Sequence, residues 1–133
     1  MSPGQSKIQV LQVDDDLLFN TVFAQHFKQH AEKVELSQVL TIADAEKRLA
    51  ETPEITWLVL DLSLPDRDGF EYIKSLGEAE VTLKVAIVSS QPPSVIQMAN
   101  TMAESVGVNV VLSYQKPLTP EKLAKLDSVI LST

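Results

Sequence analysis

Several apolar segments of the chain are each followed by polar residues that could take part in chemistry. These residues are Asp14, Asp15, Asp61, Ser89 and Lys116. Three carboxylates that lie close together repel one another, and a hard divalent cation with oxygen ligands, such as Mg²⁺, relieves that repulsion. An ammonium group opposite the cation would attract an anion, and a hydroxyl would donate a hydrogen bond to it. A carboxylate placed among these groups could be the nucleophile of a phosphoryl transfer, which depends mainly on positioning and charge neutralisation.

These residues can act together only if the ends of their segments meet at one edge of the fold. Runs of apolar and β-branched residues predict strands at 8–13, 33–39 and 55–60, a fourth within 81–88, and a fifth at 108–114. Helical periodicity between them predicts helices at 17–28, 42–51, 70–77, 93–106 and 120–130. Strict alternation of strand and helix predicts an α/β fold, a parallel sheet with helices on both faces. Ligands of such sheets bind at the carboxyl ends of the strands, where the polar residues stand.

Finer patterns refine this architecture. The alternating second strand is expected near an edge of the sheet, and the third strand, which is the most apolar, at its centre. Asp16, Asp66 and Asp68 are predicted to cap helices or to form turns. In the first helix, apolar residues near helical spacing predict the packed face, and they are Leu18, Val22, Phe23 and Phe27.

Composition excludes several classes of protein. The chain has 133 residues, a length typical of one domain, and 11 basic against 18 acidic residues give a formal net charge of −7. An acidic balance argues against direct nucleic-acid binding. The absence of cysteine excludes disulfides, zinc–thiolate sites and thiol catalysis. No apolar run is long enough to span a membrane and the first residues do not form a secretory signal, so a cytoplasmic protein is expected, with residues 1–6 as a flexible tail.

Four segments resemble the receiver domain of two-component response regulators. They are Val10–Asp16, Leu58–Phe70, Val85–Ser90 and Gln115–Thr119. The resemblance covers nearly the whole chain and implies a single receiver domain over residues 1–133. It also implies a flavodoxin-like, doubly wound, five-stranded parallel sheet with about five helices. In that fold the first and third strands meet at the switch point, where Asp14, Asp15 and Asp61 would lie.

The resemblance assigns roles to individual residues. Asp61 is expected to be the phosphoacceptor, receiving a phosphoryl group from a sensor histidine kinase or a phosphotransfer protein. Asp15 would be the direct ligand of Mg²⁺, Asp14 would act through bound water, and the backbone carbonyl of Ser63 would complete the shell. Mn²⁺ or Ca²⁺ can substitute for Mg²⁺ in this expectation. Lys116 would contact the phosphoryl group.

The same resemblance implies a switch rather than an enzyme. Ser89 matches the switch serine or threonine of receivers, and the Lys116–Pro117 peptide bond is expected to be cis. Phosphorylation would shift a population between two states and so act on a downstream effector domain or protein, and a homodimer is left open. The domain would promote its own phosphorylation and dephosphorylation. Ser63 and Gln91 each stand two positions past a site residue, and we hypothesise that they influence the lifetime of the phosphoryl group.

The chain departs from the receiver pattern at one position. Receivers often have Tyr or Phe three residues before the lysine, where this chain has Ser113, and its aromatic residue, Tyr114, comes one position later. On a strand this shift turns Tyr114 to the opposite face. The pattern from Met102 to Leu112 resembles receivers joined to cyclic-di-GMP phosphodiesterase domains.

Other interpretations remain beside the phosphoacceptor. A Mg²⁺-dependent phosphatase or mutase with an aspartyl-phosphate intermediate would usually have a second Asp where this chain has Ser63. A phosphorylation-independent interaction module on the same fold is the other alternative, and Ser113 leaves it open. His26 and His30 have the i, i+4 spacing of a metal-binding pair, but a closed site needs further ligands, so they are interpreted as a solvated or partly packed pair.

Overall fold

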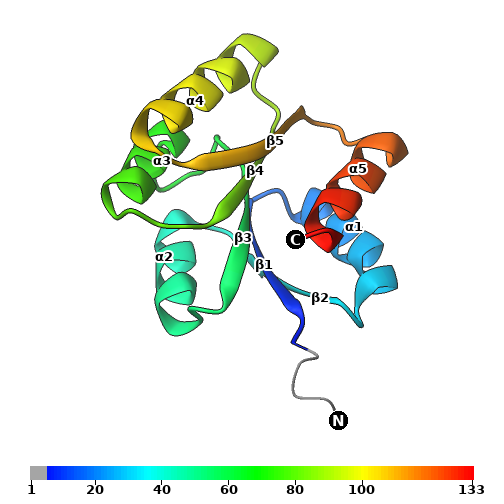
Figure 1. The fold of residues 1–133 in the computed structure, drawn as a ribbon. Helices are drawn as coiled ribbons and strands as arrows, with labels where there is room; N and C mark the ends of the chain where they lie inside the picture. Colours follow the sequence, from blue (N-terminus) through cyan, green and yellow to red (C-terminus); the bar gives the residue numbers. More distant parts are fainter. Residues whose placement is uncertain (1–5) are drawn as a thin grey trace.

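A computed structural model describes residues 6–133 and builds them from five strands and five α-helices (Figure 1). The strands are β1 (Ile8–Val13), β2 (Val34–Val39), β3 (Ile55–Leu60), β4 (Lys84–Ser89) and β5 (Asn109–Gln115). The α-helices are α1 (Leu17–Phe27), α2 (Ile42–Glu51), α3 (Gly69–Glu78), α4 (Pro93–Val106) and α5 (Pro120–Leu131); a short 3-10 helix, η1 (Lys28–His30), follows α1. Residues 1–5 of the predicted flexible tail lie outside the described residues.

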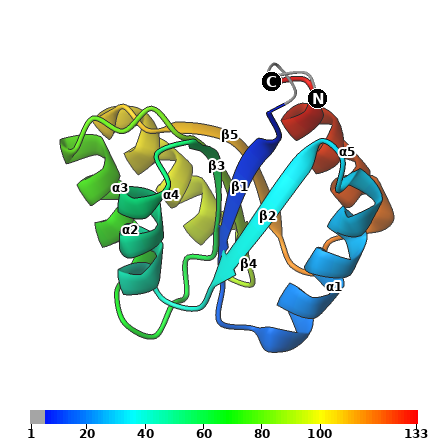
Figure 2. The ribbon, with the colours of Figure 1, turned by 90° about the horizontal axis from the view of Figure 1, so that it is seen from below.

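The strands form one parallel sheet in the order β2-β1-β3-β4-β5. This order confirms the flavodoxin-like topology, with β3 at the centre and β2 at an edge. The chain leaves β1 toward β2 and returns on the other side as β3, so β1 and β3 flank the point where the winding reverses. Helices α1 and α5 cover one face of the sheet, and α2, α3 and α4 cover the other (Figure 2).

Each face of the sheet has its own hydrophobic core. Helices α2, α3 and α4 pack on one face through residues such as Ile42, Ile73 and Ala99, all of which are fully buried. On the other face α1 and α5 cover Trp57 of β3, which is also fully buried. The Trp57 indole donates its Nε1–H to Thr133 Oγ1 at 3.1 Å, so burial leaves its polar atom paired.

The predicted packed face of α1 is partly wrong. Phe23 and Phe27 are buried. Leu18 and Val22, in contrast, are exposed to solvent, with 76% and 55% of their surface accessible. The row that packs is Phe19, Phe23 and Phe27, whose successive ring centroids lie 5.7 and 4.9 Å apart. Leu18 and Val22 each precede a member of this row, and one residue turns a helix by about 100°, so they point away from it.

Three aspartates cap the N-termini of helices as predicted, but one of them caps a helix that is distant in the sequence. Asp16 and Asp68 accept hydrogen bonds from the first turns of α1 and α3, at 3.1 and 2.8 Å. Asp66 instead reaches α2 and accepts from the backbone N–H groups of Ile42 and Ala43 at 3.1 and 3.0 Å. Desolvation by itself would raise the pKa of Asp66, but the two backbone hydrogen bonds have the larger combined effect, so the pKa is lowered.

Helices α3 and α4 approach closely at Gly77. A Cβ atom added to this glycine would lie 2.6 Å from the carbonyl oxygen of Val106 and 2.7 Å from its Cβ. The contact therefore depends on the absence of a side chain at position 77.

Candidate functional site

Sheet register brings Asp14 and Asp61 side by side. Val13 pairs with Leu60 at the ends of β1 and β3, and the backbone N–H of Asp61 donates to the carbonyl of Val13 at 3.1 Å. The next residues along the two strands therefore leave the sheet at neighbouring points. Asp14 and Asp61 are 2% and 4% exposed, whereas Asp15 is exposed.

Strands β4 and β5 deliver Ser89 and Lys116 to the same edge. Ser89 is the last residue of β4, is fully buried and pairs with Gln115. The backbone N–H of Lys116 donates to the carbonyl of Ser89 at 2.8 Å. The Lys116–Pro117 peptide bond is cis, as predicted.

The charged groups at this edge form one cluster. Lys116 Nζ lies 2.7 Å from Asp14 Oδ2 and 3.4 Å from Asp61 Oδ2, and its side chain is largely buried. Oxygen atoms of Asp14, Asp15 and Asp61 lie within 4.8 Å of one another. We call these four residues the acidic pocket. With all groups ionised, three carboxylates and one ammonium leave an excess of negative charge.

Burial and mutual contact change the pKa values of the acidic pocket. Desolvation raises the pKa of Asp14, the Asp61 charge adds to the rise, and the hydrogen bond from Lys116 opposes it. Desolvation alone would lower the pKa of Lys116, but its hydrogen bond to Asp14 and the charge of Asp61 outweigh that effect and raise it. The ammonium is therefore held in its charged form beside the carboxylates.

The acidic pocket is set up by neighbours that the sequence patterns did not single out. The buried Asn20 side chain donates from Nδ2 to the backbone carbonyl of Asp14 at 2.7 Å. The ammonium of Lys116 lies 4.3 Å from the centroid of the Phe19 ring, within the range of a cation–π contact. Both residues belong to the first turn of α1. Asn20 is a polar residue on the buried side of that turn, and this was the one feature that could have pointed to it.

A second layer of hydrogen bonds surrounds Asp61 and Ser89. Asp61 Oδ1 accepts from the backbone N–H of Ser63 at 3.1 Å, and Ser89 Oγ accepts from the backbone N–H of Gln91 at 3.2 Å. The Gln91 side chain in turn donates from Nε2 to Ser63 Oγ at 2.6 Å. The loops after β3 and β4 are thus joined, and both residues line a cavity together with Asp15 of the acidic pocket.

The donor set of the acidic pocket fits a hard divalent cation. Its three carboxylates supply oxygen only, which is the ligand type that Mg²⁺ and Ca²⁺ prefer.

Comparison with known proteins identifies the family. Residues 10–126 match the family model of the response regulator receiver domain. The chain belongs to the response regulator receiver family. A curated relative, the transcriptional regulatory protein CiaR of Streptococcus pneumoniae, is 34% identical to the receiver over 87 residues, which are 63% of this chain and 36% of that protein. The chain thus spans about a third of the length of this relative.

Solved structures agree with this assignment. A response regulator from Colwellia psychrerythraea is 29% identical, with a TM-score of 0.75 over 96% of this chain and 100% of the other. The BeF3-activated N-terminal receiver domain of Klebsiella pneumoniae RstA is 17% identical, with a TM-score of 0.76 over 94% of this chain and 99% of the other, and its likeness concerns the fold. The protein is therefore a receiver domain of a two-component response regulator.

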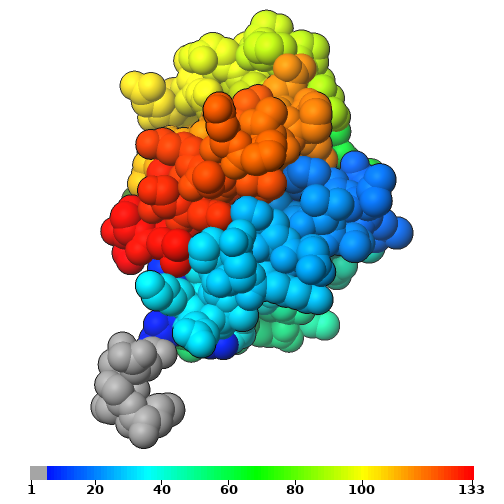
Figure 3. Space-filling model, turned by 90° about the vertical axis from the view of Figure 1, so that its right-hand side faces the viewer, coloured from blue at the N-terminus to red at the C-terminus, as the bar shows by residue number. Residues whose placement is uncertain are grey.

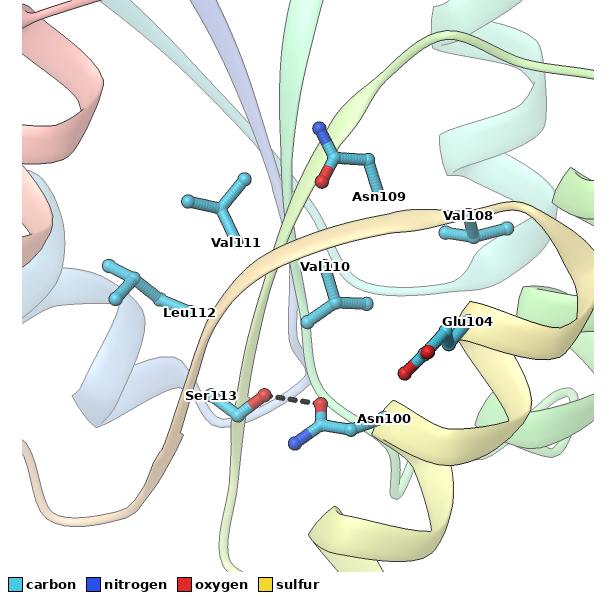
Figure 4. Close-up of a pocket in the computed structure, with 8 residues that line it drawn as sticks. All are labelled: Asn100, Glu104, Val108, Asn109, Val110, Val111, Leu112 and Ser113. Atoms are coloured by element: carbon cyan, nitrogen blue, oxygen red, sulfur yellow. Dashed lines mark hydrogen bonds between the residues drawn. The ribbon is translucent and has the colours of Figure 1, made fainter.

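The departure at Ser113 has a structural counterpart in a bulge of β5. From Val85 to the next residue of β4 the register advances by one, while on β5 it advances from Val110 to Leu112. Val111 is therefore an extra residue of β5. Ser113 donates to Asn100 Oδ1 of α4 (Figure 4). As predicted, Tyr114 points to the opposite face, where its ring centroid lies 5.7 Å from Lys122 Nζ of α5.

Within residues 6–133, no helix combines the length and the apolar character that crossing a membrane requires.

Proposed function

We propose that this receiver accepts a phosphoryl group on Asp61 and thereby switches an output. The observation that carries the proposal is the acidic pocket itself. Asp61 directly follows the central strand and its carboxylate is buried, Lys116 Nζ lies 3.4 Å from Oδ2, and two further carboxylates adjoin it. Burial of charged side chains costs free energy, which favours a functional reason for keeping this cluster.

Asp61, Asp15 and the backbone carbonyl of Ser63 would hold Mg²⁺, with Asp14 acting through bound water. Mn²⁺ or Ca²⁺ would be able to substitute for it. When bound, the ion supplies positive charge that neutralises the oxygens of the incoming phosphoryl group. The oxygen-only donor set supports this assignment.

The reaction itself would be carried by Asp61 and Lys116. A carboxylate oxygen of Asp61 attacks the phosphorus atom of a phosphohistidine, so that a P–O bond forms while the P–N bond breaks. The donor imidazole departs with the electron pair of that bond. The Ser63 N–H holds Asp61 Oδ1, which leaves Oδ2 on the Lys116 side as the reacting oxygen.

Attack by water on the acyl phosphate would return Asp61 to a carboxylate and release inorganic phosphate. The domain thus turns over no separate substrate and is not an enzyme in the ordinary sense. Ser63 and Gln91, which are joined by a hydrogen bond and line a cavity together with Asp15, would control how easily that water approaches.

Phosphorylation would be read out through β4 and β5. A phosphoryl group adds about two negative charges and new acceptor oxygens, which would draw Lys116 away from Asp14 and attract the hydroxyl of Ser89. Because Lys116 and Ser89 are joined through the backbone, their movement would shift the loop after β4 and the face formed by α4, β5 and α5. We treat the change as a shift between two existing states.

The partners follow from the same chemistry. The donor would be a sensor histidine kinase or a phosphotransfer protein in the cytoplasm, and the output a downstream effector domain or protein. A groove beside Lys116, lined by Leu18, Val22 and Leu123 among others, offers exposed apolar area where a donor could dock. Fusion to a cyclic-di-GMP phosphodiesterase, and a homodimer, stay predictions. No direct contact with nucleic acid is expected.

Incubation with Mg²⁺ and a small acyl-phosphate donor, followed by intact mass, tests the proposal. The wild type should gain the mass of one phosphoryl group, and Asp61→Ala should gain none. Asp44→Ala, which removes an exposed carboxylate of α2, is the matched control and should react like the wild type. An adduct on Asp61→Ala refutes the acceptor assignment, and a wild type that never reacts favours the phosphorylation-independent module. The phosphatase alternative gains no support, because Ser63 occupies the place of its general acid.

A further inference from the structure

A second cluster of potential metal ligands lies away from the acidic pocket, between α1 and α5. His26 Nε2 is 2.6 Å and His30 Nε2 is 3.1 Å from the same atom, Asp127 Oδ2. Asp16, which borders the acidic pocket, precedes His26 by ten residues of helix, or about 15 Å at the helical rise. The sequence offers only the histidine pair, and the fold supplies the carboxylate from a residue 101 positions away. The histidines are thus a partly packed pair, as one of the two interpretations had it, and the structure adds a carboxylate as their shared partner.

The two helices lie side by side on one face of the sheet, so the cluster joins the first and the last α-helix of the described residues. The surface of α5 adjoins that of α1 over a continuous seam (Figure 3). Side chains of His26, His30 and Asp127 are 19%, 23% and 10% exposed, so the cluster is sheltered but reachable from solvent. An ion could enter it without unfolding either helix.

We propose that His26, His30 and Asp127 form a second metal site, which takes Zn²⁺ or a similar transition-metal ion. Ligands with metal distances of about 2.0–2.2 Å in a tetrahedral shell lie about 3.3–3.6 Å apart. The three donor atoms of the cluster already lie within 4.8 Å of one another, so small side-chain rotations admit the ion. Two imidazoles and one carboxylate then leave a fourth position for water.

An unpaired carboxylate oxygen is the second observation that points to a ligand. Taken over the whole residue, Asp127 is 7% exposed. Its buried Oδ1 atom has no hydrogen-bond partner among the described residues. Both imidazoles compete for Oδ2 instead. This arrangement is unfavourable as a hydrogen-bond network, because it leaves a buried acceptor without a partner. It suits a metal ion that all three side chains can bind as ligands.

Neighbouring side chains orient the two imidazoles. The Phe27 ring lies edge-on to both, at centroid distances of 5.4 Å from His26 and 6.2 Å from His30. Gln29 Nε2 lies 3.2 Å from His26 Nδ1, the nitrogen that faces away from Asp127. A partner on the second ring nitrogen is the usual means by which proteins orient a ligating histidine. An amide can turn to present its oxygen when that nitrogen carries the proton.

The choice of ion separates this site from the acidic pocket. Imidazole nitrogen favours zinc and its neighbours, whereas the oxygen-only acidic pocket favours Mg²⁺. The chain has no cysteine that could compete for zinc, and His26 and His30 are its only histidines. Zinc at this site would tie α5 to α1 and would stabilise the folded domain.

Nitrogen-15 NMR of the imidazoles of the full chain tests the proposal directly, because the chain's two histidines contribute four ring nitrogens. Zn²⁺ is added to chelator-treated protein in excess Mg²⁺, which keeps the acidic pocket occupied. We expect the Nε2 resonances of both histidines to shift together and to saturate at one equivalent, with a parallel rise in Tm. Asp127→Asn, which preserves the size of the side chain but replaces one acceptor oxygen by an NH2 donor and removes the charge, should weaken Zn²⁺ binding at least about tenfold.

Asp15→Asn is the matched control, since it removes a carboxylate from the acidic pocket and leaves the histidine cluster intact. It should retain the wild-type affinity for Zn²⁺ at the histidines. The proposal is overturned if Zn²⁺ shifts neither Nε2 resonance in the wild type, or if the two histidines saturate at different concentrations. It is equally overturned if a folded Asp127→Asn domain binds Zn²⁺ as tightly as the wild type.

Discussion

Replacing Lys116 by methionine should expose how strongly the acidic pocket depends on one cation. Within residues 6–133, Lys116 is the only basic side chain that forms an ion pair with Asp14 or Asp61. Its distances of 2.7 and 3.4 Å correspond to attractions of about 6 and about 5 kcal/mol at an effective dielectric constant of about 20, before desolvation is subtracted. Removing one partner of a buried pair costs about 3–5 kcal/mol, and we expect a loss of unfolding free energy in that range at neutral pH.

The loss should depend on pH and on Mg²⁺. Desolvation already raises the pKa of Asp14, and without the opposing hydrogen bond from Lys116 this pKa rises further. A folded-state carboxyl pKa above the unfolded value means that the folded state binds more protons between the two values, so stability falls as pH rises. The deficit of the variant should therefore shrink as the pH is lowered from about 7.5 to about 5. Mg²⁺ should also reduce it, because an ion that binds only the folded state stabilises that state.

Urea unfolding of the wild type and Lys116→Met, at both pH values and with or without Mg²⁺, measures these differences. Lys125→Met removes an exposed lysine of α5 and should change stability by less than about 0.5 kcal/mol. A loss below about 1 kcal/mol for Lys116→Met would place the pair in the range of surface ion pairs and refute the reasoning. A loss of the expected size that responds to neither pH nor Mg²⁺ would also contradict it.

The dephosphorylation rate should change by the same factor in Gln91→Ala, in Ser63→Ala and in the double variant, because the two side chains act through one hydrogen bond. Effects that add in the double variant would count against this reasoning. Asp66→Ala should cost about 1 kcal/mol in urea unfolding at neutral pH. Since the folded-state pKa of Asp66 is lowered, that contribution is present above its unfolded pKa and should vanish as acid protonates the folded form. Gly77→Ala should cost about 1–3 kcal/mol in thermal unfolding, because its new methyl group meets Val106; an unchanged Tm would show that α3 and α4 can move apart freely.

The edge of the sheet that carries the acidic pocket could be predicted because its signals are local. Apolar segments end abruptly at Asp14, Asp61 and Ser89, and alternation of strands with helices makes the sheet parallel, which brings those ends together. The cis bond before Pro117 followed from the family resemblance rather than from any pattern in the residues. The functional roles of these residues stay predictions until the phosphoryl adduct is measured.

Features that depend on distant contacts could not be predicted. Spacing alone marked Leu18 and Val22 as packed, because a helix with apolar residues on two sides does not reveal which side meets the sheet. Nothing near His26 indicates that Asp127 will lie beside it, since the contact depends on how α5 is placed against α1. The extra residue of β5 was hidden for a similar reason, because a bulge is defined by the register of the neighbouring strand.

Val111 also bears on how the domain avoids unwanted assembly. Strand β5 forms an outer border of the sheet, where unpaired backbone groups invite a further strand from another molecule. An interrupted ladder at Val111 deprives such a strand of a regular template, so propagation into fibrils would stall at this border. The bulge would thus oppose edge-to-edge aggregation through β5, although position 111 carries no charged side chain.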